Sequence, residues 1–585
     1  MHQCLCIDDI LRVVFSFIDE HEYDPTQGVY VRQEHSLRML SALSRTCHTF
    51  KDPALDVLWR EIPDLFILIK SRIPSHLQGI KKANLFFVSQ PSLEDWKLLD
   101  PYIDRIRIIG TPLPFTRPKR LLLHEKTVLQ PLEQYLREHG PSTEGRSLLP
   151  NLTEVVWDDR WARSQDIIRN LLMGPSLSSL HFTRLHHMTS LLSQTSAPNN
   201  LRNLTLHAVS YLTDSHLGFA HATILDGLRT FQNLQHISIT LGLLSNDTIA
   251  HLASLPTLKS LGIHLYLYRI GDVDEANVGP TGNRHGVRFS HLRRLSLTID
   301  GWYDRPSLPF VERFIDTSTL EAISVTFTLQ APNRSEAHFL RWLLQCVAPA
   351  APTLRELSVY TGVARPTWSW YSGRDPDFHF ASFPDLLRFT KLRTLRLEHQ
   401  RNLCPANNDA LRAIADAFPD LEFLSLAAPG VTEYEANLDP EDLPTLDGLL
   451  PMAERCRDLH TLRLPIRSTL IHRDEALRAA SRCASTIRTL SLWATPLEVE
   501  VEHFAETGYE AVENASRSMS AFTTEDTAMF FREVFPHLDD LRVVIPKDDA
   551  FGLNRVEDIH GWSDVLDKLA ETEIPGSVTR SRVLE

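Results

Sequence analysis

A short apolar pattern recurs along most of this 585-residue chain and constrains its fold more than any other feature. In residues 389–399, FTKLRTLRLEH, the side chains Leu392, Leu395 and Leu397 are spaced three and then two apart, with polar residues in every gap. The same L-x-x-L-x-L pattern, with Ile, Val or an aromatic residue allowed at the apolar positions, returns every 24 to 38 residues between Leu152 and Ile487. Recurrence at such intervals is typical of repeat architectures, in which one supersecondary unit is stacked many times.

The first apolar residue of each repeat marks where a short strand is expected. These residues are Ile103, Leu152, Leu177, Leu201, Leu234, Leu258, Leu292, Leu320, Leu354, Leu392, Leu421, Leu459, Ile487 and Leu538. The two outer gaps are longer than the others, so we expect each to contain a degenerate repeat.

The segments between the strands predict helices. Residues 335–359 open with Ser335 as a plausible N-cap, continue with apolar residues at helical spacing, and reach a proline before the strand. Residues 408–426, with Asn408 as the cap, and residues 525–543 follow the same order. A cap, an apolar helical stripe, a breaker and a short strand together predict one helix-strand unit.

Such a unit cannot bury its apolar face alone, so stacked neighbours would place parallel strands on one side and helices on the other. The pattern resembles leucine-rich repeats, and it is most similar to the helix-containing, irregular, ribonuclease-inhibitor-like type. The resemblance implies an α/β fold, a leucine-rich-repeat solenoid shaped as a horseshoe. The alternative is a doubly wound α/β fold, which would show longer apolar strands and a Gly-rich turn.

Residues 1–62 lack the repeat and contain apolar residues at helical spacing. The segment 6–19, CIDDILRVVFSFID, predicts a first helix with a broad apolar face, and a polar, turn-rich stretch follows at 19–36. The segment 37–62, LRMLSALSRTCHTFKDPALDVLWREI, predicts two more helices separated by a break at Pro53. Three short helices are too small for a generous core of their own.

These segments resemble an F-box, in a form similar to F-box proteins of basidiomycete fungi. We therefore predict an F-box at 1–62, a linker or first degenerate repeat at 63–100, a leucine-rich-repeat array at 101–545, and a C-terminal cap or tail at 546–585. A different interpretation of residues 1–62 is a cap that hides the open end of the array. A cap needs one apolar face, whereas docking to a second protein needs two.

The resemblance implies that the chain is the substrate-recognition subunit of an SCF-type ubiquitin ligase, with a Skp-family adaptor and a cullin scaffold as partners. The alternative is a leucine-rich-repeat interaction scaffold that is not linked to ubiquitination. As apolar anchors for the adaptor we predict Ile10, Leu11, Val14, Phe15, Leu40, Leu43, Leu58 and Trp59.

Candidate substrate-binding residues come from the strands and from one long loop. In a strand the leucines turn inward and their neighbours turn outward, and loop aromatics often bind partners. The candidates are His207, His264, Tyr360, Trp368, Trp370, Tyr371, Arg396, Glu398, Arg463 and Trp493. For any one of them the competing interpretation is an incidental large side chain on a solvated face.

Charge and motifs argue against several other functions. The net charge of -14 disfavours nucleic acid as a partner, and no apolar run is long enough to cross a membrane. Seven scattered cysteines and the lack of a secretory signal favour the cytoplasm or nucleus. No catalytic motif or metal-ligand spacing is present, so we expect a protein that is not an enzyme and has no cofactor.

Overall fold

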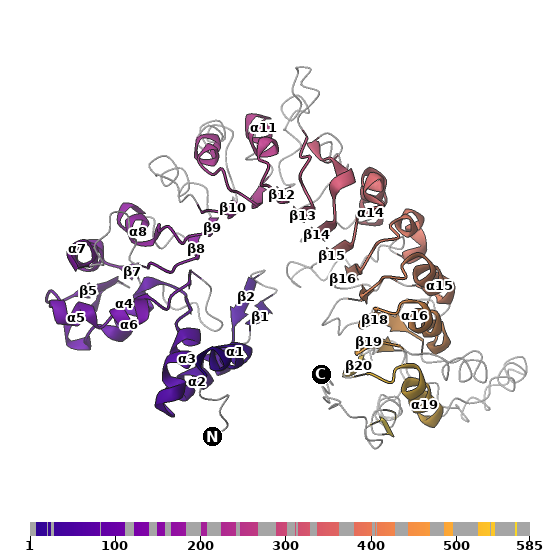
Figure 1. Ribbon diagram of the computed structural model, residues 1–585, viewed down its shortest axis with the longest axis horizontal. Helices are drawn as coiled ribbons and strands as arrows, with labels where there is room; N and C mark the ends of the chain where they lie inside the picture. The colour runs from indigo at the N-terminus through magenta and orange to yellow at the C-terminus, as the bar shows by residue number, and fades with distance from the viewer. Residues whose placement is uncertain are drawn as a thin grey trace, which may run out of the picture. The chain divides into compact units, whose positions relative to one another are not determined.

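Figure 1 shows the computed structural model of the chain. The described residues are 7–19, 21–24, 29–81, 84–110, 122–139, 149–157, 165–182, 200–206, 224–240, 246–266, 288–300, 311, 314–327, 336–361, 379–399, 404, 406–427, 443–467, 485–494, 524–538, 540–544, 565 and 568–569.

The chain divides into two compact units, each built on parallel strands. Unit 1 comprises residues 1–265 and 273–287, and unit 2 comprises residues 266–272 and 288–585. The boundary therefore falls inside the predicted repeat array, and the predicted F-box belongs to the same unit as the first repeats.

In unit 1 the parallel strands follow one another in chain order. They are β3 (Glu61–Ile62), β6 (Ile108–Ile109), β8 (Glu154–Trp157), β9 (Ser179–Phe182), β10 (Asn203–Leu206), β11 (His236–Thr240) and β12 (Ser260–Tyr266). Its helices include α4 (Leu65–Arg72), α5 (Leu93–Lys97), α6 (Asp100–Ile103), α7 (Gln130–His139), α8 (Gln165–Leu172) and α11 (Asn246–Ser254).

Unit 2 repeats this order with its own strands and helices. The strands are β13 (Arg294–Asp300), β14 (Ala322–Phe327), β15 (Glu356–Thr361), β16 (Thr394–His399), β17 (Phe423–Ser425), β18 (Thr461–Ile466), β19 (Thr489–Ala494) and β20 (Asp540–Val544). The helices include α14 (Glu336–Cys346), α15 (Asn408–Ala417), α16 (Leu450–Arg455) and α19 (Thr524–Val534). In Figure 1 these helices lie along one side of the strands of their unit.

The leucine pattern forms the core, as predicted. All fourteen first residues of the repeats, from Ile103 to Leu538, are buried. In unit 2 one apolar residue from each strand pairs in register with its neighbours, in the order Leu295, Ile323, Leu357, Leu395, Leu424, Leu462, Leu490 and Leu541. In unit 1 the corresponding column is Ile62, Ile109, Val155, Leu180, Leu204, Ile237 and Leu261. The prediction of aligned inward residues is therefore confirmed within each unit.

Two local predictions within the repeats need correction. The pattern that starts at Ile103 would make Ile106 and Ile108 the inward residues, whereas Ile109 occupies the column and Ile103 ends helix α6. The cap of α15 is Asn407, whose side chain accepts a hydrogen bond of 3.0 Å from the Ala410 N–H. Asn408 is instead the first helical residue, and its side-chain amide donates to the Thr445 hydroxyl at 2.8 Å.

The segment predicted as a linker or degenerate repeat is folded. After α4, strand β4 (Gln78–Lys81) pairs antiparallel with β5 (Asn84–Phe87), and β5 pairs in parallel with β7 (Leu122–Leu123). Trp96 of α5 packs edge-on against Phe87 of β5, with ring centroids 5.6 Å apart. These contacts make a small second sheet at the side of unit 1.

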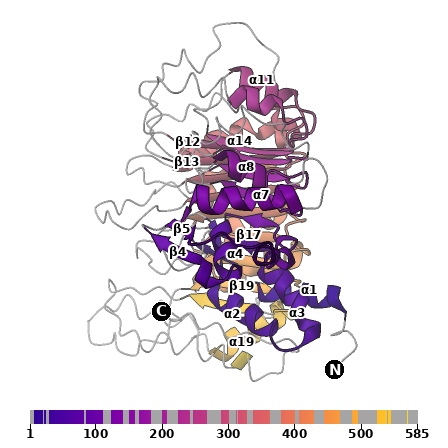
Figure 2. The ribbon, with the colours of Figure 1, turned by 90° about the vertical axis from the view of Figure 1, so that its left-hand side faces the viewer.

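At the N-terminal end, three helices form a cluster that both ribbon views show (Figures 1 and 2). They are α1 (Asp8–Ile18), α2 (Glu34–Leu43) and α3 (His48–Leu58). The predicted break at Pro53 is wrong, because Pro53 lies inside α3 and the two helices are separated at residues 44–47. The stretch predicted as polar and turn-rich contains the antiparallel strands β1 (His21–Asp24) and β2 (Val29–Arg32). Among the described helices none is both long and apolar enough to cross a lipid bilayer.

Candidate functional site

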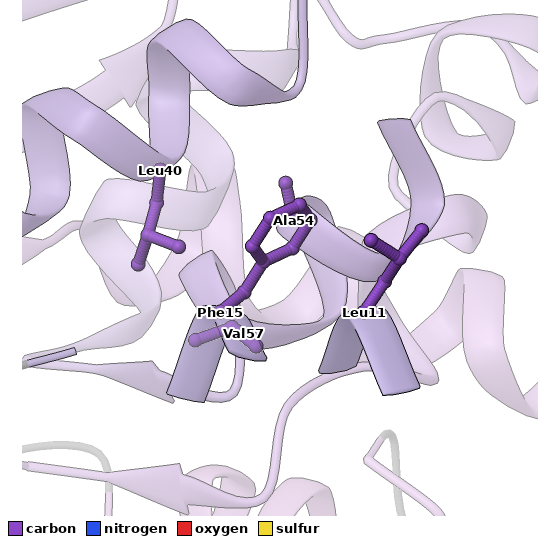
Figure 3. Packing of buried hydrophobic residues seen from close by; sticks show 5 residues of the cluster. All are labelled: Leu11, Phe15, Leu40, Ala54 and Val57. Atoms are coloured by element: carbon purple, nitrogen blue, oxygen red, sulfur yellow. The ribbon is translucent and has the colours of Figure 1, made fainter. Parts of the chain in front are cut away.

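Helix α1 carries one apolar face toward the protein core. Leu11 is 1% exposed and Phe15 is 3% exposed, and both pack with Leu40 of α2 and with Ala54 and Val57 of α3 (Figure 3). The Phe15 ring also meets the Phe50 ring edge-on, with centroids 5.5 Å apart. The three helices therefore share a small core of their own.

The same helix carries a second apolar face that is exposed. Ile10, Val13, Val14 and Phe17 follow the spacing i, i+3, i+4 and i+7, so they line one side of the helix. Phe17 is 78% exposed. Together with Ile7, which precedes the helix, these four residues define what we call the α1 stripe: Ile7, Ile10, Val13, Val14 and Phe17 are all exposed large apolar side chains.

An exposed stripe of this kind is unusual on a protein surface. Single exposed apolar residues are common, but a contiguous row along one helix marks a site of interaction. Of the exposed large apolar residues in the described part of the chain, five belong to this one short segment. Residues Asp8 and Asp9 in the first turn and Arg12 and Ser16 farther along give α1 a polar side as well.

The structure sorts the eight predicted adaptor-binding residues into three groups. Ile10 and Val14 are exposed, and Leu43 and Leu58 are half-buried against the three-helix core. The prediction is corrected for the remaining four, because these side chains are buried inside the protein and cannot also contact a partner: Leu11, Phe15, Leu40 and Trp59.

Sequence reasoning missed Ile7 and Val13 and did not choose Phe17 as an anchor. Met39 of α2, which is also exposed, was missed too. The helical period does contain this signal, because Ile10, Val13 and Phe17 fall on one side of the helix. What the period could not show is which of two adjacent apolar faces turns toward the core.

Trp59 is buried at the junction between the three helices and the rest of unit 1. Its ring centroid lies 4.8 Å from that of Tyr102. The Arg72 guanidinium lies over both rings, 3.9 Å from the Tyr102 centroid and 4.7 Å from the Trp59 centroid. Such cation–π contacts stabilise a packed arrangement, so Trp59 has a structural role here.

A buried arginine fixes the end of α3. Arg32 of β2 forms an ion pair with Asp19. Its guanidinium also donates to the backbone carbonyls of Val57 at 2.8 Å and Leu58 at 3.0 Å. A cation at the C-terminus of a helix satisfies carbonyls that have no partner inside the helix, so the β1–β2 hairpin is tied to α3.

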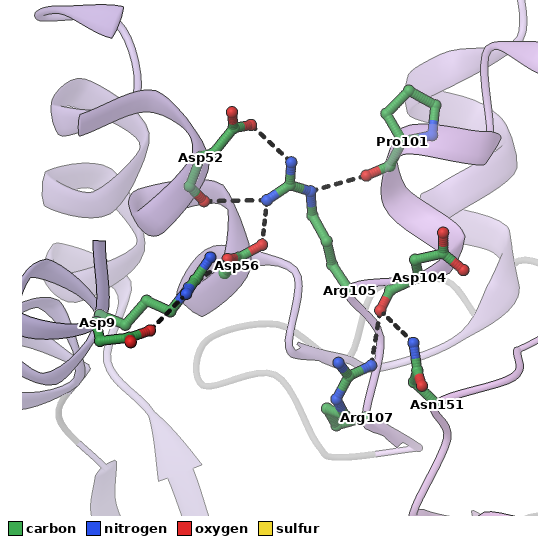
Figure 4. Close-up of polar contacts among 9 residues, drawn as sticks. Asp9, Asp52, Asp56, Pro101, Asp104, Arg105, Arg107 and Asn151 are labelled. Carbon is green, nitrogen blue, oxygen red and sulfur yellow. Dashed lines mark hydrogen bonds and ion pairs between the residues drawn. The ribbon is translucent and has the colours of Figure 1, made fainter. Parts of the chain in front are cut away.

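A network of ion pairs joins the three helices to the first repeats (Figure 4). Asp56 of α3 accepts a hydrogen bond of 2.7 Å from Arg12 of α1 and also pairs with Arg105. Arg105 pairs with Asp52 at 2.7 Å and donates to the Pro101 carbonyl at 2.7 Å. The position of α1 is therefore set by unit 1 and not by a free linker.

Half of the predicted substrate-binding residues lie wholly or partly outside the described part of the chain. His207, Trp368, Trp370 and Tyr371 lie outside the described residues, and the described part of Trp493 is its backbone in strand β19. The other candidates lie on strands. His264 is on β12, Tyr360 on β15, Arg396 and Glu398 on β16, and Arg463 on β18.

In unit 2 we define the polar face as the side of the strands that bears the residues between the core leucines. On this face the Arg396 guanidinium lies 4.2 Å from the centre of the Phe423 ring, and that of Arg463 lies 5.6 Å from the same ring. Glu398 follows on the same side of β16 and is 7% exposed. Phe423 was not among the candidates, because it lies outside the L-x-L positions from which they were chosen.

In unit 1 the corresponding side of the strands carries histidines. Burial lowers the pKa of His264 to about 4. Burial also lowers the pKa of His181, although the Glu154 carboxylate 3.5 Å away acts in the opposite direction. Among the described residues, no group of three His, Cys, Asp or Glu side chains is arranged to hold a metal ion.

Comparisons with known proteins leave the family of this chain open. No protein-family model and no curated protein matches it. Among solved structures it is similar to a chain in the crystal structure of the Rad7 and Elc1 complex in yeast, with a TM-score of 0.25, at 15% sequence identity, over 67% of this chain and 86% of that one. A likeness this distant assigns neither a family nor a function, so the site is interpreted from its own residues.

Proposed function

We propose that this protein is the substrate-recognition subunit of an SCF-type ubiquitin ligase. The α1 stripe would bind a Skp-family adaptor that is joined to a cullin scaffold. The strands of the two units would belong to leucine-rich repeats, and their polar faces would bind a protein substrate. The observation that carries the proposal is the second apolar face of α1, which lies in the segment that resembles an F-box.

The α1 stripe has the physical properties of a helix-binding anchor. Burying an exposed aliphatic or aromatic side chain stabilises a complex by about 1.5–3 kcal/mol before the costs of association are subtracted. Four side chains on one helix face therefore supply enough apolar surface for a specific interface with a helical partner. A segment that only capped the repeats would leave no such face exposed.

In this proposal the protein performs no bond chemistry. It would hold a substrate lysine near an enzyme that carries ubiquitin, and the rate would rise because two reactants are kept together. No cofactor or metal is required for this role.

Point variants test the proposal more cleanly than a truncation. Removing residues 1–62 would delete strand β3, which pairs with β6, and would leave Arg105 without Asp52 and Asp56. A truncated protein could lose binding simply because unit 1 is damaged. The test therefore uses the full chain, with Phe17→Asp and Val13→Asp as the variants.

The measurement is retention of purified Skp-family adaptor on the immobilised full-length protein. We expect the wild type to retain the adaptor, and each variant to weaken retention at least about tenfold, because a charge would be buried in an apolar interface. Val88→Asp is the matched control, since Val88 is 67% exposed and lies outside the three helices. Absent or unchanged retention would overturn the ligase proposal and favour a repeat scaffold that is not linked to ubiquitination.

A further inference from the structure

Along strands β13 to β19, the polar face of unit 2 places two arginines in a row of small hydroxyl residues. Strand register aligns one residue from each of these strands: Ser296, Ser324, Ser358, Arg396, Ser425, Arg463 and Ser491. Strand β20 continues the row with Arg542. Within β13 to β19 the residues of the row other than the two arginines are short and neutral. They come from β16 and β18, with Ser425 of β17 between them.

The guanidiniums of Arg396 and Arg463 both lie near the Phe423 ring. Phe423 precedes Ser425 by two residues on β17, so both side chains lie on the same face. The Arg396 and Arg463 guanidinium carbons lie 4.2 Å and 5.6 Å from the centre of its ring. A guanidinium stacked on an aromatic ring keeps the N–H groups at its edge, where they can donate to a bidentate acceptor.

Arg396 is not neutralised by the nearest acidic residue of its own strand. Glu398 lies two residues farther along the same side of β16, yet its Oε1 atom is buried and accepts no hydrogen bond. Arg396 is exposed and forms no ion pair with any residue that the structure describes. The contact with Phe423 therefore keeps this cation available for an external anion.

We propose that Arg396, Phe423 and Arg463 form a binding site for an acidic segment of a partner protein, recognised through carboxylate side chains. A carboxylate suits the exposed Arg396 guanidinium, because the two can form a bidentate pair, and Arg463 adds a second positive charge near the same ring. The Glu398 carboxyl group beside Arg396 opposes the larger charge of a phosphate group. The inference rests on the proposed function where it identifies this segment as part of the substrate, but the binding chemistry is independent of the adaptor.

The test measures fluorescence anisotropy of a labelled peptide, Gly-Ser-Glu-Ser-Glu-Ser-Gly, with the full-length protein. We expect saturable binding that weakens as salt is raised. A peptide with Gln in place of both Glu residues should bind at least about tenfold more weakly, because it offers no charge to the guanidiniums. Arg396→Ala and Arg463→Ala should each cost about tenfold for the Glu peptide.

Two further variants separate the site from a general loss of charge. Arg393→Ala is the matched control, because Arg393 precedes the same strand and already pairs with Glu422 at 2.9 Å, so binding should stay within about twofold. Arg396→Lys keeps the charge but lacks the planar fork, so we expect it to bind nearly as weakly as Arg396→Ala. Thermal melts of all variants check that unit 2 remains folded.

Three results would overturn the inference. They are no binding of the Glu peptide, equal binding of the Gln peptide, and tighter binding of a peptide with phosphoserine in place of both Glu residues, which would make the site a phosphate site. Adaptor retention is measured on the same variants and should not change. Retention of the adaptor without binding of the acidic peptide would contradict this inference alone. Binding of the peptide without retention of the adaptor would contradict the proposed function alone.

Discussion

Arg105 and Asp52 lie 53 positions apart in the sequence and form an ion pair in which the guanidinium Nη2 is 2.7 Å from the carboxylate Oδ1. The same guanidinium donates to the Asp52 backbone carbonyl at 3.0 Å and pairs with Asp56. One side chain from the start of the repeats therefore contacts α3 at three acceptors. The three-helix cluster and the first repeats of unit 1 behave as one packed body.

Replacing Arg105 should loosen this junction. Among the described residues, Arg105→Ala leaves the half-buried carboxylate of Asp56 with Arg12 as its ion-pair partner, and we expect a loss of about 1–2 kcal/mol. Amide hydrogen exchange in α3 should accelerate more than exchange in strands β8 to β12. Arg137→Ala, which removes an exposed pair with Glu133, should leave both unchanged. Equal acceleration throughout unit 1 would contradict a local role.

Arg32 should be the most sensitive position of the N-terminal cluster. Arg32→Met would remove the cation that pairs with the half-buried Asp19 carboxylate and the donor to the Val57 and Leu58 carbonyls at the end of α3. We expect a cost of about 3–5 kcal/mol, visible as rapid cleavage of residues 19–60 in limited proteolysis.

A double variant provides the control for this pair. Arg32→Met combined with Asp19→Leu removes both charges, so it should be more stable than Arg32→Met alone. If the double variant were the less stable of the two, the half-buried carboxylate would not be the source of the cost.

Gly110 directly follows strand β6, in a conformation that disfavours residues with a Cβ atom. Its φ angle is +103°, and a Cβ atom there would collide with the Val156 carbonyl oxygen. Gly110→Ala should therefore cost about 2 kcal/mol or more, measured by thermal unfolding. Gly110→Asn should be similarly unstable, because the collision comes from Cβ itself. An Asn variant as stable as the wild type would show that the backbone angle alone is limiting.

His264 predicts a pH dependence of stability. Its pKa is lowered to about 4 by burial, below the ordinary value of 6.5, so the unfolded chain binds this proton more readily than the folded one. The free energy of unfolding should therefore fall as the pH drops from 6.5 toward 4, by at most about 3 kcal/mol from this group. Above pH 6.5 the group contributes no slope.

The measurement compares wild type with His264→Gln in urea unfolding at several pH values. The difference between the two proteins should change between pH 6.5 and pH 4 and should be constant above that range. Other titrating groups, including His181, contribute to both proteins and cancel. A difference that stays constant over the whole range would contradict the lowered pKa.

The core of each unit was predictable from sequence because the same apolar L-x-x-L-x-L pattern recurs along the chain. A leucine in the column, such as Leu395 or Leu424, is confirmed by its equivalent in every neighbouring strand. Where the apolar pattern is ambiguous, comparison with neighbouring repeats does not identify the inward residue. The isoleucines at 106, 108 and 109 allow two registers, and only the pairing of Ile109 with Val155 decides between them.

The candidate site was only partly predictable, for physical reasons. Helix α1 has two adjacent apolar faces, and the choice between them depends on packing against α2 and α3, which no local pattern encodes. The β1–β2 hairpin was missed because each strand is only four residues long and the surrounding stretch is rich in polar and turn-forming residues. Phe423 was missed because its partners Arg396 and Arg463 become neighbours only when three strands are aligned.

Strand β3 begins at Glu61, three positions after α3 ends at Leu58, and it pairs directly with β6. A protein bound to α1 would consequently keep a fixed orientation relative to unit 1. The short connection and the strand pairing would fix the orientation of such a partner. If a flexible linker joined the three helices to unit 1, the partner would adopt many orientations. Lengthening the chain between Leu58 and Glu61 would replace the fixed orientation of the partner by a range of orientations.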